Sequence, residues 1–227
     1  MRFPALTAVA AVLIFAGCGS DDPSATGNSA GDGEPSAGQT KGVADGPMTP
    51  RRYEQLEDLY EAGIESEKAG AVGEFRASTR ILLRACDRVD RDDRLLAAVT
   101  LDCDQALSEL HAIFGEDCSS PESCAPLARR GARAARQSIE TGRETNDVIA
   151  DEVDDVACRD ALMSSDRYLT ALSKLADALD DLAATIDENG DIDAAQARLD
   201  RASAAIEALP SARAMLRRFQ RACAPSA

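Results

Sequence analysis

The chain has 227 residues and a formal net charge of −15, because 40 acidic side chains outnumber 25 basic ones. This charge excludes a general nucleic-acid-binding protein, which needs a basic surface toward the phosphates. Aromatic residues make up only 4% of the chain, Trp is absent, and no run of β-branched residues recurs with a period of two. The composition therefore predicts an all-helical fold with an aliphatic core.

The N-terminus has the pattern of an export signal. Arg2 precedes an uncharged apolar run from Ala5 to Ala16, which is shorter than the ~20 residues that span a bilayer but typical of the core of a secretory signal peptide. The run ends in Phe15-Ala16-Gly17-Cys18. This motif resembles the lipobox of bacterial lipoprotein precursors, although Phe15 stands where Leu is usual.

The resemblance implies that the chain is cut between Gly17 and Cys18 and carries a thioether-linked diacylglycerol on Cys18. It also implies further acylation such as palmitate, and two or more chains anchor a protein stably where one is marginal. We therefore expect residues 1–17 to be a signal peptide and the mature protein to be held on the outer face of the cell membrane. The alternative is an ordinary cleaved signal followed by a chance cysteine.

Residues 18–49 form the next segment, which is rich in Gly, Ser, Asp, Ala and Pro and shows no apolar periodicity. Such a composition cannot bury enough apolar surface to fold. We expect a disordered tether with a mean reach of about 30 Å. The remaining residues, 50–227, are long enough for one helical bundle domain with a sizeable core.

Helix signals begin at Thr49-Pro50, which suits an N-cap and first turn. Apolar residues then recur at steps of three and four, and Gly70 and Gly73 break or bend this first helix. A second helix is predicted over about 93–113. Residues 115–121 form the loop that ends it.

A third helix is predicted to begin near residue 122. Residues 144–189 contain neither Gly nor Pro, so this stretch is either one very long helix or two helices divided near 151–155; we favour the division. The last helix follows a turn at Gly190 and kinks or breaks at Pro210. The pattern predicts an antiparallel bundle of four to five helices.

Six cysteines remain once Cys18 carries lipid, and an even number in an exported chain favours three disulfides. Cys158 lies 32 residues before Gly190 and Cys223 lies 33 after it. Antiparallel helices rise equally per residue, so a hairpin around Gly190 brings Cys158 and Cys223 together.

The other cysteines are paired by loop length and elimination. Cys118 and Cys124 flank a short loop that a disulfide could close, and Cys86 and Cys103 are then left for each other. The register of this last pair is poor for a simple hairpin. A metal site is the alternative, but the cysteines lack Cys-x-x-Cys spacing and a nearby His.

No residue pattern indicates catalysis, a metal centre or a cofactor. His111 is the only histidine, so any Ser-His-Asp or Cys-His arrangement would have to use it. Its place beside the apolar seam favours a partly exposed residue on the flank of a helix.

One segment resembles the middle of a calcium-binding EF-hand loop, residues 187–193. Thr185 and Gln196 stand where the end carboxylates are needed. We therefore interpret Asn189-Gly190 as a helix C-cap, followed by an aspartate N-cap.

Charged residues recur at helical spacing. Basic stripes comprise Arg76, Arg80, Arg84, Arg88 and Arg91; Arg129, Arg133 and Arg136; and Arg213, Arg217 and Arg221. An acidic stripe comprises Glu140, Glu144, Asp147, Asp151 and Asp154. We favour ion pairing between helices, as at coiled-coil flanks. The alternative is that Arg76, Arg80, Arg84 and Arg88 dock on anionic headgroups or an anionic ligand.

These observations predict a membrane-anchored lipoprotein of the cell envelope that is not an enzyme. Its expected role is to bind a partner protein or the cell wall, or to act structurally. The alternative is a small-ligand or metal-ion binding or sensing lipoprotein with a site between helices.

Overall fold

A computed structural model of the chain describes residues 48–224. The expected signal peptide, the lipidated Cys18 and the tether up to residue 47 lie outside the described residues. Met48 belongs to the tether as the sequence predicts it, but its apolar side chain is buried in the core. The described core therefore includes a residue two positions before the predicted start of the helical domain.

The described residues form helices and loops with no strand, which confirms the all-α fold. The six helices of twelve or more residues are α2 (Pro50–Ala71), α3 (Phe75–Cys86), α6 (Pro121–Glu152), α8 (Asp166–Asp187), α9 (Ile192–Glu207) and α10 (Ala212–Cys223). Four shorter ones are α4 (Arg94–Val99), the π-helical turn η2 (Cys103–Leu107), α5 (Ser108–Ile113) and α7 (Val156–Leu162). The bundle is thus more finely divided than the sequence predicted.

The first helical hairpin begins and turns where the sequence indicated. Thr49 caps α2 by accepting a hydrogen bond from the Arg52 backbone N–H at 3.2 Å, and Pro50 occupies the first turn. Gly73 has a φ of 84°, which a residue with a side chain rarely adopts. The chain therefore breaks between α2 and α3 rather than bending.

Residues 144–189 do not form one long helix, which confirms the favoured division, but the chain breaks twice in this stretch. The first break ends α6 before Val153, and Asp155 caps α7 through the Cys158 N–H at 2.8 Å. The second break, over 163–165, was not predicted. There the Asn146 side chain of α6 accepts from the Ser164 N–H at 2.6 Å and donates to the Ser164 carbonyl at 2.9 Å.

The α8–α9 turn is a helix cap, as the sequence indicated. Asn189 has a φ of 51°, and the Gly190 N–H donates to the Thr185 carbonyl at 2.9 Å. Asp191 caps α9 through the Ala194 N–H at 3.0 Å. Pro210 separates α9 from α10, so it breaks the helix.

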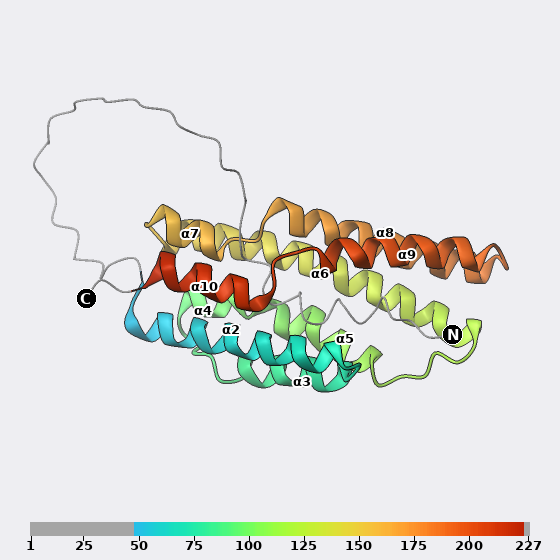
Figure 1. Cartoon of the computed structure of the whole chain (residues 1–227), viewed down its shortest axis with the longest axis horizontal. Coiled ribbons are helices and arrows are strands. Elements are labelled where there is room, and N and C mark those ends of the chain that lie inside the picture. The colour runs from blue at the N-terminus through green and yellow to red at the C-terminus, as the bar shows by residue number, and fades with distance from the viewer. Residues whose placement is uncertain (1–47, 225–227) are drawn as a thin grey trace, which may run out of the picture.

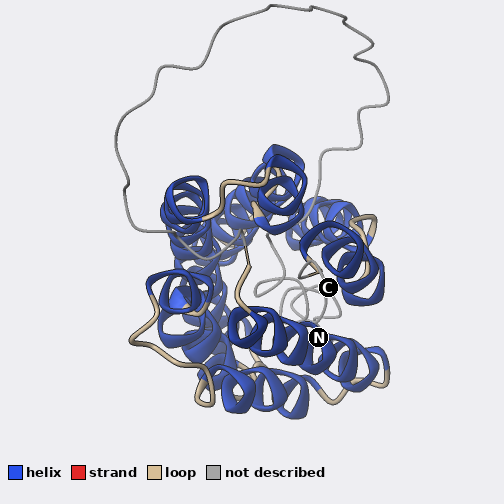
Figure 2. Cartoon of the chain, turned by 90° about the vertical axis from the view of Figure 1, so that its left-hand side faces the viewer, coloured by secondary structure: helices blue, strands red, loops and turns tan. Residues whose placement is uncertain are grey.

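The helices form an elongated bundle (Figure 1). The pairs α2–α3 and α8–α9 lie along opposite long edges, and α6 passes between them and packs most extensively against α8. One core cluster joins α5, α8, α9 and the first half of α6, and a second joins α2, α3, α4, α7 and α10. Viewed from the end, the helices surround the long axis of the bundle (Figure 2).

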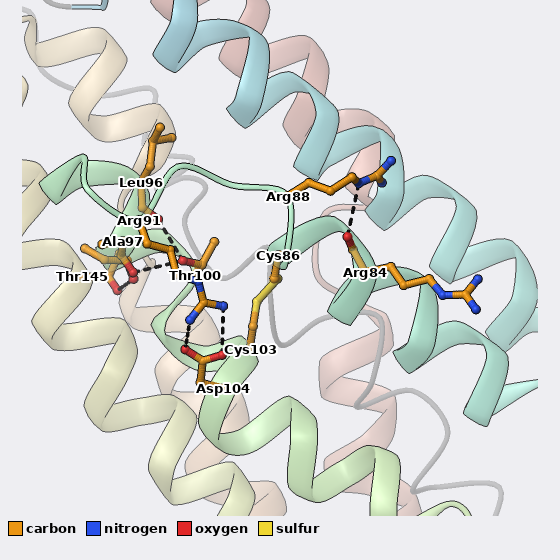
Figure 3. The surroundings of a disulfide bond; sticks show 11 residues. Arg84, Cys86, Arg88, Arg91, Leu96, Ala97, Thr100, Cys103, Asp104 and Thr145 are labelled. Carbon is orange, nitrogen blue, oxygen red and sulfur yellow. Dashed lines mark hydrogen bonds and ion pairs between the residues drawn. A yellow bond between two sulfur atoms is a disulfide. The ribbon is translucent and has the colours of Figure 1, made fainter.

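Three disulfides connect the helices, in the pairing that the sequence suggested. Cys158–Cys223 joins α7 to α10 with a Cα–Cα distance of 4.6 Å, Cys118–Cys124 closes the loop before α6 at 4.7 Å, and Cys86–Cys103 joins α3 to η2 at 6.4 Å. Figure 3 shows the last pair. The poor hairpin register of Cys86 and Cys103 is overcome because short α4 ends at Val99 and the chain returns toward α3.

Candidate functional site: the charged face of the first hairpin

Four arginines form a ridge along α3 and the turn after it. We call Arg76, Arg80, Arg84 and Arg88 the α3 arginine ridge; all four are exposed. Side chains spaced by four residues form a continuous row on a helix, and this one is about 18 Å long at 1.5 Å per residue. In Figure 3, Arg84 and Arg88 extend to one side of the Cys86–Cys103 disulfide.

The α3 arginine ridge has no ion-pair partner among residues 48–224. Among the hydrogen bonds between described residues, the ridge side chains make one, from Arg88 Nε to the Arg84 carbonyl at 3.2 Å. Arg91, the fifth member of the predicted stripe, turns away and makes a bidentate pair with Asp104 (Figure 3). Among the described residues, the expected pairing between helices is therefore wrong for these four arginines, whose side chains are exposed on a helix that packs on α2, α5 and η2.

The other stripes differ from one another. On α6, Arg129 pairs with Asp187 of α8, and Arg136 pairs with Asp180, so the expected interhelical pairing holds for these two. Arg133 has no ion pair with a described residue. In the acidic stripe only Asp151 has a described partner, Arg94, at 3.0 Å.

The α10 stripe, Arg213, Arg217 and Arg221, is exposed and has no ion pair with a described residue. The sequence shows that these stripes exist, but which of them meet depends on how the helices are arranged.

His111 lies on α5 beside the first half of the ridge. Its Nδ1 is 2.7 Å from the Thr79 hydroxyl oxygen, and Thr79 is fully buried on α3. Burial, followed by repulsion from Arg76 and Arg80, lowers the pKa of His111. The ring is therefore neutral at neutral pH, and its titration reports the charge around these two arginines.

The His111–Thr79 contact does not have the arrangement of a catalytic pair. The Thr79 hydroxyl is also 3.2 Å from the carbonyls of Phe75 and Arg76 in its own helix. A hydroxyl that donates to a helix carbonyl can accept from the His111 N–H but is not activated as a nucleophile. The half-buried position of His111 agrees with the helix-flank residue that the sequence suggested.

A second stripe, of opposite sign, lies beside the ridge. It consists of Glu54, Asp58, Glu61 and Glu65 on α2, which we call the α2 acidic stripe; all are exposed, and none has an ion pair with a described residue. Asp58 and Arg88 border the same shallow depression between α2 and α3. This stripe was not predicted, although its steps of four and three are visible in the sequence.

A buried polar cluster was also missed. Asp102 is buried, and its Oδ1 accepts from the Thr141 hydroxyl at 2.9 Å. Its Oδ2, the Ser138 hydroxyl and the Tyr168 hydroxyl are buried without a hydrogen bond of normal geometry from any described residue. Burial raises the pKa of Asp102 to about 6, although the nearby Ser138 and Thr141 hydroxyls lower it. No sequence pattern separates Asp102 from the exposed aspartates around it.

The described part of the chain was also searched for a metal site and a membrane-spanning helix. Within residues 48–224 no group of three or more His, Cys, Asp or Glu side chains is placed to hold a metal ion. No helix in that range is long and apolar enough to cross a membrane. Comparison with protein families, curated proteins and solved structures finds no match for this chain.

Proposed function

We propose that the protein is a lipid-anchored lipoprotein of the cell envelope whose helical domain is a non-enzymatic binding module. The observation that carries the binding role is the α3 arginine ridge, which is exposed and has no ion-pair partner among the described residues. Export and anchoring rest on the signal pattern that ends at Cys18. The three disulfides suit an oxidising compartment outside the cytoplasm.

An anionic partner suits this ridge for two reasons. Guanidinium groups bind carboxylates and phosphates in bidentate pairs. The chain as a whole is strongly acidic, with a net charge of −15, so other anions are repelled from most of its surface. On a chain that is otherwise acidic, a row of arginines favours an anionic partner and is the surface where that partner would bind.

His111 offers a direct test, because it is the only histidine and repulsion from Arg76 and Arg80 contributes to its lowered pKa. The experiment uses the exported chain with Cys18→Ser, which keeps it free of lipid, and poly-L-glutamate as an anionic probe. The ring signals of His111 are followed by NMR through a pH titration, with and without the probe. An anion bound to the ridge should raise the pKa of His111.

The control is a matched pair of triple variants. Arg80→Gln, Arg84→Gln and Arg88→Gln remove three ridge charges, whereas Arg213→Gln, Arg217→Gln and Arg221→Gln remove the same charge from α10. We expect the probe to shift His111 in the parent and in the α10 variant, and to have a much smaller effect in the α3 variant. A parent whose His111 does not respond, or an equal response in the α3 variant, would contradict the proposed binding role.

A further inference from the structure

We infer that the partner of the α3 arginine ridge is a second copy of this chain, which presents its α2 acidic stripe. The inference rests on the proposed binding role of the ridge and names its partner. The two stripes lie on neighbouring helices, because α2 and α3 are consecutive and antiparallel and pack together (Figure 1), and the stripes meet where Asp58 and Arg88 border one depression.

The register between the two helices places opposite charges at equal heights. The buried Ser66 and Ser78 hydroxyl oxygens are 2.7 Å apart and fix the alignment of α2 against α3. Because the helices are antiparallel, residues before Ser66 on α2 lie level with residues after Ser78 on α3. Glu65 is therefore about level with Arg80, and Glu61 with Arg84. Asp58 is about level with Arg88, and these two residues border one depression.

These neighbours do not form ion pairs within the chain. All six of their side chains are exposed. A surface with a positive stripe beside a negative one is complementary to itself. A two-fold axis that lies in the interface and runs parallel to the helices sets each α3 arginine ridge opposite the α2 acidic stripe of the other copy.

The footprint indicates a weak dimer. The ridge is about 18 Å long, and the acidic stripe lies on a second helix whose axis is about 10 Å away. Together they offer far less than the ~800 Å² per partner of a stable complex. Exposed ion pairs are also individually weak and are screened by salt. Such contacts become effective when both copies are held at the same surface, as a lipid anchor on Cys18 would do.

Two other occupants of the ridge are less well matched. A flat anionic membrane would bring headgroups against the α2 acidic stripe as well as the arginines, and like charges would meet. The segment before residue 48 carries Asp21, Asp22, Asp32, Glu34 and Asp45, but their spacing does not repeat the steps of four along the ridge. Exposed acidic stripes with helical spacing occur on both α2 and α6, but the α2 acidic stripe is the one on the helix that packs alongside α3, in register with the ridge.

The test is sedimentation equilibrium of the exported chain carrying Cys18→Ser, at low salt and up to millimolar protein. We expect a concentration-dependent dimer that dissociates in about 1 M salt, where charges are screened within about 3 Å. Arg80→Glu, Arg84→Glu and Arg88→Glu together should give a monomer. Adding Asp58→Arg, Glu61→Arg and Glu65→Arg to the same chain exchanges the two stripes and should restore the dimer.

The control is the triple variant Arg213→Glu, Arg217→Glu and Arg221→Glu, which makes the same change in net charge on α10 and should dimerise like the parent. A parent that stays monomeric at low salt, an equal loss in the α10 control, or a correctly folded exchange variant that remains monomeric would overturn the inference. If the parent is monomeric but poly-L-glutamate still shifts His111, only the identity of the partner is wrong. If His111 does not respond either, the binding role fails as well.

Discussion

Replacing Asp102 with Asn should stabilise the protein at neutral pH, which is unusual for a buried residue. Asp102 is charged at pH 7 because its pKa is about 6, yet its Oδ2 receives no hydrogen bond of normal geometry from a described residue. An Asn side chain keeps the oxygen that accepts from Thr141. Its amide can donate to the Ser138 or Tyr168 hydroxyl, neither of which makes a hydrogen bond of normal geometry with a described residue.

The size of the effect follows from the pKa. An Asp in an unfolded chain titrates near 3.9, about two units below the folded value, and each unit corresponds to 1.36 kcal/mol. Because the folded pKa is the higher one, ionisation of Asp102 opposes folding. Relative to a side chain that cannot ionise, Asp102 costs nothing below about pH 4, and the cost grows as the pH rises through the folded pKa to about 3 kcal/mol at higher pH.

The assay is urea unfolding of the parent and of Asp102→Asn between pH 4 and pH 7. We expect the variant to gain up to about 3 kcal/mol at pH 7 and little at pH 4, which corresponds to roughly 6–12 °C in melting temperature at pH 7. Asp104→Asn is the matched control, because Asp104 is exposed and its pair with Arg91 should contribute less than about 1 kcal/mol. A variant that is less stable than the parent at pH 7, or a difference that does not vary with pH, would refute this account of the cluster.

Three further outcomes follow from the structure. Asn146→Ala removes both hydrogen bonds to the break between α7 and α8, so it should lower the free energy of unfolding by about 1–3 kcal/mol in urea; an unchanged value would mean that these bonds do not hold the break. Replacing Cys158 and Cys223 together by Ala should cost about 2–5 kcal/mol, and a non-reducing peptide map that links either cysteine elsewhere would contradict the α7–α10 pairing. Arg80→Gln should raise the pKa of His111 by removing a nearby charge, as an NMR titration can measure; a pKa that stays the same would place Arg80 too far away to act.

Features that depend on regular helix geometry could be predicted from the sequence. The rise per residue is constant in a helix, so equal arms around Gly190 were enough to suggest the Cys158–Cys223 disulfide. Local signals at Thr49-Pro50 and Asn189-Gly190 likewise gave helix ends, because capping involves only near neighbours.

Features that depend on distant contacts could not be predicted. The break at 163–165 is held by Asn146, which lies 18 residues away from Ser164 on another helix. The periodicity of arginines revealed the α3 arginine ridge, but not that its side chains turn outward and lack a described partner. Asp102 has the local sequence of an exposed aspartate, and only the packing of α6 and α8 around it makes it buried.

The most direct test of the proposed lipoprotein is mass spectrometry of the N-terminal peptide of the protein isolated from its own membrane fraction. The proposal requires a mature chain that begins at Cys18 and carries a diacylglyceryl group and additional acyl chains on that residue. The Cys18→Ser variant should be released from membranes or remain unprocessed. A mature chain that begins at another residue, or an unmodified Cys18 on protein that stays membrane-bound in high salt, would contradict the proposal.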